Sequence, residues 1–283
     1  MIWVTWRQHS REAAVASSIV ILIAANLVFE WFQITSASRQ LGLGSCQSSA
    51  VVDSACGIAM NSFMNSFFGT SVTVRYVLVA LPALLGVFVA APLLAREVEE
   101  GTHMFIWTQS ITRTRWFTVK VFLIASFTLV VAAALAATAS WWHQPLDLMY
   151  ADGSWTFFEV IGTTPVAYAI FALTLGVAMG TLIQHTVPAM ATTLLLFVAA
   201  RVAIHLWRPW FLAPMTKEYP IASTDLIGVL PISGPTHGDA HGILVYQPAE
   251  RFWTFQLIET GIFLLLALLL ITFSAWWLRH RIR

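Results

Sequence analysis

Six long apolar runs, each poor in charge, constrain this chain more than any other feature of its sequence. A run of about 20 apolar residues can cross the roughly 30 Å hydrocarbon core of a bilayer as a helix. We expect spans at Ala13–Ile34, Tyr76–Ala95, Trp116–Ser140, Val160–Ile183, Val187–Trp207 and Leu257–Leu278. Only residues 184–186 separate the fourth run from the fifth, so these two spans must form an antiparallel hairpin. The sequence therefore predicts an all-α integral membrane protein with six transmembrane helices.

Composition supports the membrane assignment. Of the 283 residues, 58% are hydrophobic and only 10% are charged, whereas soluble domains carry about 25% charged residues. Apolar surface of this extent is solvated by lipid, so membrane lipids are expected partners. The net charge of +1 provides no strong field for nucleic acid, and no nucleic-acid partner is expected.

The distribution of Lys and Arg around the spans predicts the orientation. Nine flank the spans on the side of the N-terminus and five flank them on the other side, with Arg201 left inside a span. Because positive charge accumulates in cytoplasmic loops, we expect both termini in the cytoplasm and residues 36–75 and 208–256 outside. The expected location is the bacterial plasma membrane.

The first residues combine Ile2, Trp3 and Trp6 with basic side chains, which favours a short amphipathic helix on the cytoplasmic membrane surface. A frayed tail is the alternative. A cleaved signal peptide is disfavoured, because the apolar run is too long and contains Asn26 and Glu30.

The chain has two cysteines, Cys46 and Cys56, both in the expected outer loop after the first span. An isolated pair in an oxidising compartment favours a disulfide, which would contribute roughly 2–3 kcal/mol by chain entropy. Two free thiols remain the alternative.

Catalytic motifs are missing from the sequence. It contains no G-x-x-x-x-G-K-[ST], no H-E-x-x-H and no G-x-S-x-G, so the chain cannot bind ATP through a P-loop. His237, Asp239 and His241 could hold a metal, but a loop rich in Gly and Pro is a poor preformed cage and a solvated polar loop is favoured. We therefore expect no catalytic residue, metal or cofactor on this chain.

Ionisable side chains inside membrane spans are functional candidates by default. They form three groups on helix faces: Asn26, Glu30 and Gln33; Arg201, His205 and Arg208; and Gln256, Glu259 and Thr260. We expect Arg201 to pair with Glu259 or Glu30 in the outer third of the membrane. A structural ion pair is favoured over substrate contact. The small pair Gly176 and Gly180 predicts close helix packing within the chain.

The segment 96–115 joins the second and third spans on the cytoplasmic side. Acidic residues from Glu97 end one helix and Gly101 breaks it, while Thr102 can begin a short helix that exposes Phe105 and Trp107. Ser110 or Thr112 can cap the next helix, which begins with Arg113. A short apolar helix between charged flanks fits a docking surface for another protein, and equally fits a helix lying on lipid.

This pattern resembles the coupling region of ABC export permeases of the type-2 (type V) fold. The residues that carry the resemblance are Glu97, Gly101, Thr102, Thr108, Ser110, Arg113 and Lys120. The opening Met1–His9 and the closing Phe252–Glu259 resemble an actinobacterial subgroup. The chain departs from the family at 109–112, which reads Gln-Ser-Ile-Thr where members often have Pro-Val-Ser before the Arg.

The resemblance spans nearly the full chain and implies one permease domain, residues 1–283. It implies a separate ATPase subunit that carries ATP and Mg and docks on the coupling helix, and a homodimer or a paired permease. For 208–256, which holds six of the eleven prolines, it implies an outer segment with short re-entrant helices. An ordinary structured loop explains that composition equally well.

The sequence thus predicts a permease subunit of an ABC exporter that moves an unidentified substrate outward. The alternative is a stand-alone secondary transporter or channel, with Glu30, Arg201 and Glu259 as an ion relay. An embedded enzyme ranks third.

Overall fold

The structure, a computed structural model, describes residues 2–43, 54–101, 112–148, 153–218, 229–233 and 243–280. Within these residues, six helices are long and apolar enough to cross a membrane. They are α1 (Ile2–Gln40), α3 (Ser54–Leu85) continued by η1 (Gly86–Ala90) and α4 (Ala91–Glu99), α6 (Arg113–Trp142), α7 (Thr164–Ile183), α8 (Thr186–Trp207) and α9 (Phe252–His280). The expected all-α membrane protein with six spans is confirmed.

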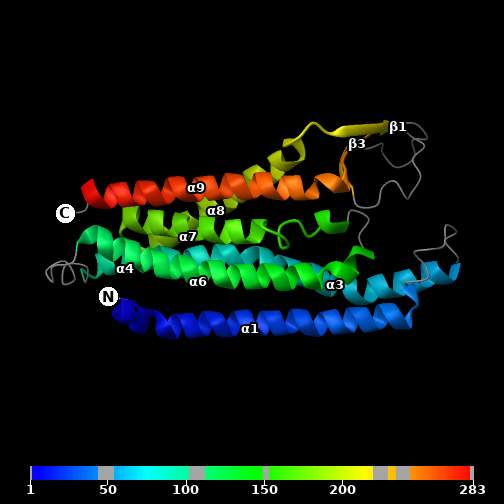
Figure 1. Ribbon diagram of the computed structural model, residues 1–283, viewed down its shortest axis with the longest axis horizontal. Helices are drawn as coiled ribbons and strands as arrows, with labels where there is room; N and C mark the ends of the chain where they lie inside the picture. The colour runs from blue at the N-terminus through cyan, green and yellow to red at the C-terminus, as the bar shows by residue number, and fades with distance from the viewer. Residues whose placement is uncertain are drawn as a thin grey trace.

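The helices lie side by side as one elongated bundle (Figure 1). The start of α1 and the end of α9 lie at the same end of this bundle, here called the terminal end. A small sheet lies beyond the opposite end, here called the sheet end. An even number of spans requires this arrangement of the termini.

The first helix is longer than the expected span. Ile2–Gln40 is one helix of 39 residues, so the expected separate interfacial helix is instead the first part of α1. No Gly or Pro occurs between Ile2 and Gln40, and nothing in the local sequence therefore interrupts the helical hydrogen bonds.

The second span also extends beyond its apolar part. Helix α3 begins at Ser54, whereas residues up to 75 were expected to form an outer loop. The polar side chains there bond to their own helix, as Ser66 Oγ does to Ser62 O at 2.9 Å and Thr73 Oγ1 to Gly69 O at 2.8 Å. The 45-residue helix Ala55–Glu99 is about 68 Å long, roughly twice the hydrocarbon thickness.

Helix α7 lies at the centre of the bundle. In its most apolar window 78% of the residues are buried in the protein, against 11% in α1. The segment η1, a π-helical turn after Pro82, brings Gly86 against α7. A Cβ added at Gly176 would lie 2.5 Å from Gly86 O, and one at Gly180 would lie 2.6 Å from Ala91 O. The expected close packing of these two glycines within the chain is confirmed.

This contact supports a prediction about stability. We expect Gly176→Ala to destabilise the protein by about 1–3 kcal/mol, because the new methyl group meets backbone atoms of η1 and α4 that cannot move independently. Gly261→Ala in α9 is the matched control, since its Cβ would meet nothing within 4 Å. Thermal unfolding of both variants in detergent checks this, and equal melting of the two would contradict it.

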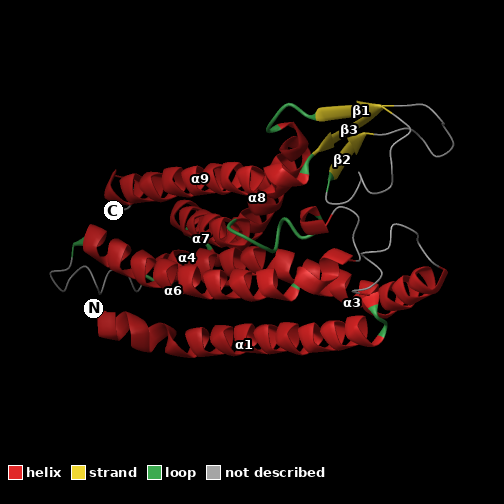
Figure 2. Ribbon diagram, turned by 45° about the vertical axis from the view of Figure 1, so that its right-hand side comes forward, coloured by secondary structure: helices red, strands yellow, loops and turns green. Residues whose placement is uncertain are grey.

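The segment between α8 and α9, which the sequence predicts to lie outside, contains a sheet among its described residues instead of the implied re-entrant helices. The strands β1 (Met215–Glu218), β2 (Leu230–Ser233) and β3 (Ile243–Gln247) form an antiparallel sheet in the order β1-β3-β2 (Figure 2). Lys217 pairs with Leu244, and a register shift lies between Pro231 and Ser233.

The sheet is tied to the bundle through the end of β3. The buried Gln247 donates from Nε2 to Pro209 O at 3.0 Å and to Leu212 O at 2.8 Å. Arg251 donates from Nη1 to Gln247 Oε1 at 2.9 Å. These bonds hold the short turn η4 (Arg208–Trp210) against η6 (Ala249–Arg251), so the end of α8 is fixed near the start of α9.

Candidate functional site

The connection between α6 and α7 folds back onto the sheet end of the bundle. After η2 (Gln144–Leu148), the turn η3 (Gly153–Trp155) and the residues up to Thr163 carry Trp155, Phe157 and Phe158 into the core. Trp155 stacks on Phe158 with ring centroids 5.7 Å apart and meets Phe255 of α9 edge-on at 5.3 Å. This packed connection carries Glu159 to the bundle.

The side chain of Gln256 joins α9 to the beginning of α7. Its Oε1 accepts from the backbone N–H groups of Thr163 and Thr164, both at 3.1 Å, and its Nε2 donates to Phe158 O at 2.8 Å. Gly162 is required beside it, because its φ is +72° and a Cβ there would lie 2.8 Å from Gln256 Oε1. These bonds fix the position of the connection relative to α9.

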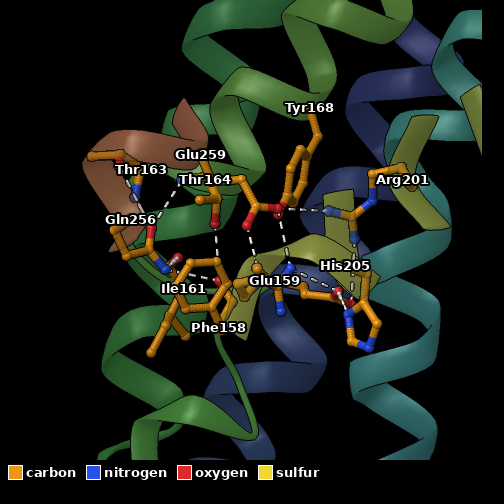
Figure 3. Close-up of polar contacts among 11 residues, drawn as sticks. Phe158, Glu159, Ile161, Thr163, Thr164, Tyr168, Arg201, His205, Gln256 and Glu259 are labelled. Atoms are coloured by element: carbon orange, nitrogen blue, oxygen red, sulfur yellow. Dashed lines mark hydrogen bonds and ion pairs between the residues drawn. The ribbon is translucent and has the colours of Figure 1, made fainter. Parts of the chain in front are cut away.

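Glu259 lies one turn further along α9 and is 1% exposed. Arg208 donates from Nε to Oε2 at 2.8 Å and from Nη2 to Oε1 at 3.1 Å, which is a two-bond fork. The hydroxyl of Tyr168 on α7 donates to Oε1 at 2.5 Å, and Arg201 Nη1 lies 3.8 Å from the same oxygen. Both oxygens of this buried carboxylate are therefore occupied (Figure 3).

Glu159 forms the second half of the network. Its carboxylate lies 3.3 Å from Arg201, 3.1 Å from Arg208 and 3.1 Å from Nδ1 of His205. Burial alone would raise the pKa of Glu159, but the hydrogen bond to His205 and the charges of Arg201 and Arg208 outweigh it and hold that pKa well below its usual range. Glu159 is therefore ionised at neutral pH.

We name Glu159, Tyr168, Arg201, His205, Arg208 and Glu259 the outer charge cluster, because the sequence predicts Arg201 and Glu259 in the outer third of the membrane. Figure 3 labels all of these residues except Arg208. Two carboxylates oppose two guanidinium groups, so the formal charges of these four side chains balance. The guanidinium of Arg201 also lies 3.6 Å from the ring centroid of Tyr168. The cluster links α7, α8, α9 and the connection before α7, and it is saturated by its own partners.

The sequence predicted part of this cluster. The pairing of Arg201 with Glu259 is confirmed, and His205 of α8 and Arg208, the residue directly after α8, both contact Glu159. Among the described contacts, Glu30 has no hydrogen bond or ion pair to the cluster. Glu159 and Tyr168 were not predicted, although the aromatic run before Glu159 was a signal that the loop packs inward.

At the terminal end, two carboxylates tie α4 to its neighbours. Glu97 is buried and bonds to the buried ammonium of Lys120 on α6, which also donates to Leu93 O at 3.3 Å. Glu99 accepts from Thr186 N at 2.8 Å and Thr186 Oγ1 at 2.7 Å, where α8 begins. The last turn of α4 is thus bonded both to α6 and to the hairpin between α7 and α8.

The segment expected to form the coupling helix follows this turn in the sequence. Gly101 has φ +70° and follows the end of α4, and Thr112 accepts from Arg115 N at 3.4 Å and caps α6, as expected. Thr102, Phe105 and Trp107 lie outside the described residues, and the side chain of Arg113 is not described.

Two other expectations also fall on residues that the structure does not describe. Cys56 lies in the first turn of α3, but Cys46 is outside the described residues, so their disulfide stays a prediction. The loop with His237, Asp239 and His241 also lies outside the described residues, so the expectation that it is a solvated polar loop stays a prediction.

Fold and site together define a multi-pass membrane protein with helical spans, whose buried charged side chains bond one helix to another. The family model described as ABC-2 membrane transporter related matches residues 17–208, and the chain belongs to this family. It is a transporter permease. No curated protein and no solved structure matches the chain. The matched range includes Glu97, Lys120, Glu159 and Arg201, and it ends at Arg208.

Proposed function

We propose that the chain is the membrane-spanning subunit of an ABC exporter, which moves its substrate outward with energy from a separate ATPase subunit. The observation that carries this proposal is the arrangement of α4. Its last turn is bonded to α6 by Glu97 and Lys120 and to the start of α8 by Glu99. A displacement of the segment that joins α4 to α6 would therefore be transmitted to α4, α6 and α8 together.

The segment in that position is 102–111, which carries the expected coupling residues Phe105 and Trp107. In this proposal the ATPase docks there and carries ATP and Mg. Two permease units pair, as a homodimer or with a second permease, because two ATPases must close together. Closure of the ATPases shifts the bundle between inward and outward states.

The proposed topology has the terminal end in the cytoplasm of a bacterial cell and the sheet end outside. The excess of Lys and Arg at the terminal end supports it. A stand-alone transporter would need a relay that connects Glu30 with Arg201 and Glu259. Both oxygens of Glu259 are occupied within the outer charge cluster, so no observation favours that alternative.

Phe105→Ala and Trp107→Ala test the proposal. We expect each to weaken binding of the ATPase subunit by roughly 1–3 kcal/mol, because aromatic anchors dominate small interfaces. The measurement is co-purification of an ABC ATPase subunit that is co-expressed with each variant, followed by an ATPase assay in nanodiscs.

Trp210→Ala is the matched control, since this exposed aromatic residue lies at the sheet end. If both coupling variants keep full partner binding and full ATPase stimulation, the segment is a lipid-facing helix and the stand-alone transporter becomes the better explanation.

A further inference from the structure

Two neighbouring cavities lie between α1 and the rest of the bundle. Helix α1 occupies one edge of the bundle and packs mainly against α6, with little contact to α3 (Figures 1 and 2). The larger cavity is about 420 Å³ and is lined by apolar side chains of α1, α3, α6 and α7. This volume lies within the range of sites for drug-sized ligands.

The smaller cavity is about 220 Å³ and lies between α1 and α3. Its wall carries four polar side chains, Asn26, Glu30, Thr70 and Thr73. Leu78 lines both cavities, so the polar pocket adjoins the apolar one. Taken together, these two adjoining cavities offer a space with a larger apolar part and a smaller polar part.

The carboxylate of Glu30 is incompletely satisfied. Its Oε2 is buried and has no hydrogen-bond partner among the described residues. The indole of Trp142 interacts with this carboxylate, but its Nε1 makes no hydrogen bond of ordinary geometry. An unpartnered carboxylate in a membrane span is costly, and a cation would offset that cost. The outer charge cluster, by contrast, is saturated and offers no comparable acceptor.

We propose that this space binds an amphiphilic cation, with its apolar body between α1, α3, α6 and α7 and its charged group on Glu30. This ligand is the substrate class of the proposed exporter. Its transport rests on the proposed function, whereas its binding does not. An amine with an apolar body matches the chemistry of both parts. A ligand that lies between α1 and α3 can enter from the lipid, because these helices make little contact with each other.

The test is equilibrium binding of two probes to the full chain in nanodiscs, without an ATPase subunit. Dansylcadaverine carries a dansyl body and a primary ammonium, and its N-acetyl derivative has the same body without the charge. Energy transfer from tryptophan to dansyl reports binding after subtraction of empty nanodiscs. We expect the cation to bind about tenfold more tightly, which corresponds to about 1.4 kcal/mol.

Glu30→Gln should abolish this preference and leave the affinity for the neutral probe unchanged, which also shows that the cavity is intact. Glu218→Gln, in the exposed strand β1, is the matched control and should keep the preference. Ala132→Phe should weaken binding of both probes, since Ala132 lines the larger cavity.

Equal affinity for the two probes, or a preference that survives Glu30→Gln, would overturn the proposal. So would unchanged binding to a folded Ala132→Phe variant. Because this assay uses no ATP and no partner, its result is independent of the test of ATPase docking.

Discussion

Glu259→Gln is expected to lower the stability of the folded protein by about 3–5 kcal/mol, the usual cost of removing one partner from a buried ion pair. The change leaves Arg201 and Arg208 facing Glu159 alone. It also removes the charged acceptor of the Tyr168 hydroxyl, which lies 2.5 Å from Glu259 Oε1. The measurement is the midpoint temperature of thermal unfolding of the purified protein in detergent, monitored by tryptophan fluorescence.

A second substitution separates unbalanced charge from the loss of packing. Arg208→Gln combined with Glu259→Gln restores the charge balance, so the double variant should melt closer to the wild type than Glu259→Gln alone. Glu250→Gln, at an exposed carboxylate in η6, should change stability by no more than about 0.5 kcal/mol. If Glu259→Gln melts like Glu250→Gln, the cluster does not hold the sheet end together.

Hydropathy predicted where the chain crosses the membrane but not where the helices end. The apolar part of the second span begins near Tyr76, whereas α3 begins at Ser54. Polar residues such as Ser66 and Thr73 remain helical because their hydroxyl groups bond to carbonyls one turn earlier. A hydropathy scale for membrane spans assigns such residues to a loop, although they are compatible with a helix that continues into water.

The sheet between α8 and α9 could not be predicted from local patterns. Strand β3 pairs with β1, which lies 25 or more residues earlier in the chain, and its pairing with β2 shifts register between Pro231 and Ser233. Pairing over such separations depends on how the ends of α8 and α9 are held. That position depends on the buried Gln247 and its bonds to Pro209 and Leu212.

Part of the outer charge cluster follows from helical periodicity. Arg201, His205 and Arg208 recur at intervals of three and four residues, so they must share a face of α8. Glu159 lies in a connection whose return to the bundle depends on Trp155, Phe158 and Gln256. Its place beside the arginines is a tertiary effect, which no single segment of the sequence encodes.

The buried pair at the terminal end gives the second large effect. Lys120→Met is expected to destabilise the protein by about 3–5 kcal/mol, because it removes the buried ammonium that bonds to the buried Glu97. Adding Glu97→Gln should recover most of this loss. The neighbouring pair Arg96 and Glu100 is a matched control on the same helix, since these side chains are 67% and 51% exposed and Glu100→Gln should be nearly neutral.

The charge-free double variant, Lys120→Met with Glu97→Gln, then tests coupling separately from stability. It should fold and should bind the ATPase subunit normally, because the docking segment 102–111 is unchanged. ATP-driven transport should nevertheless fall by about 2–30-fold, since the ion pair between Glu97 and Lys120 no longer ties the last turn of α4 to α6. Transport of a dansyl amine into inverted vesicles, compared with ATP consumption, measures this. Undiminished transport by a stable double variant would show that the Glu97–Lys120 bond holds the fold but does not carry motion from the ATPase to the spans.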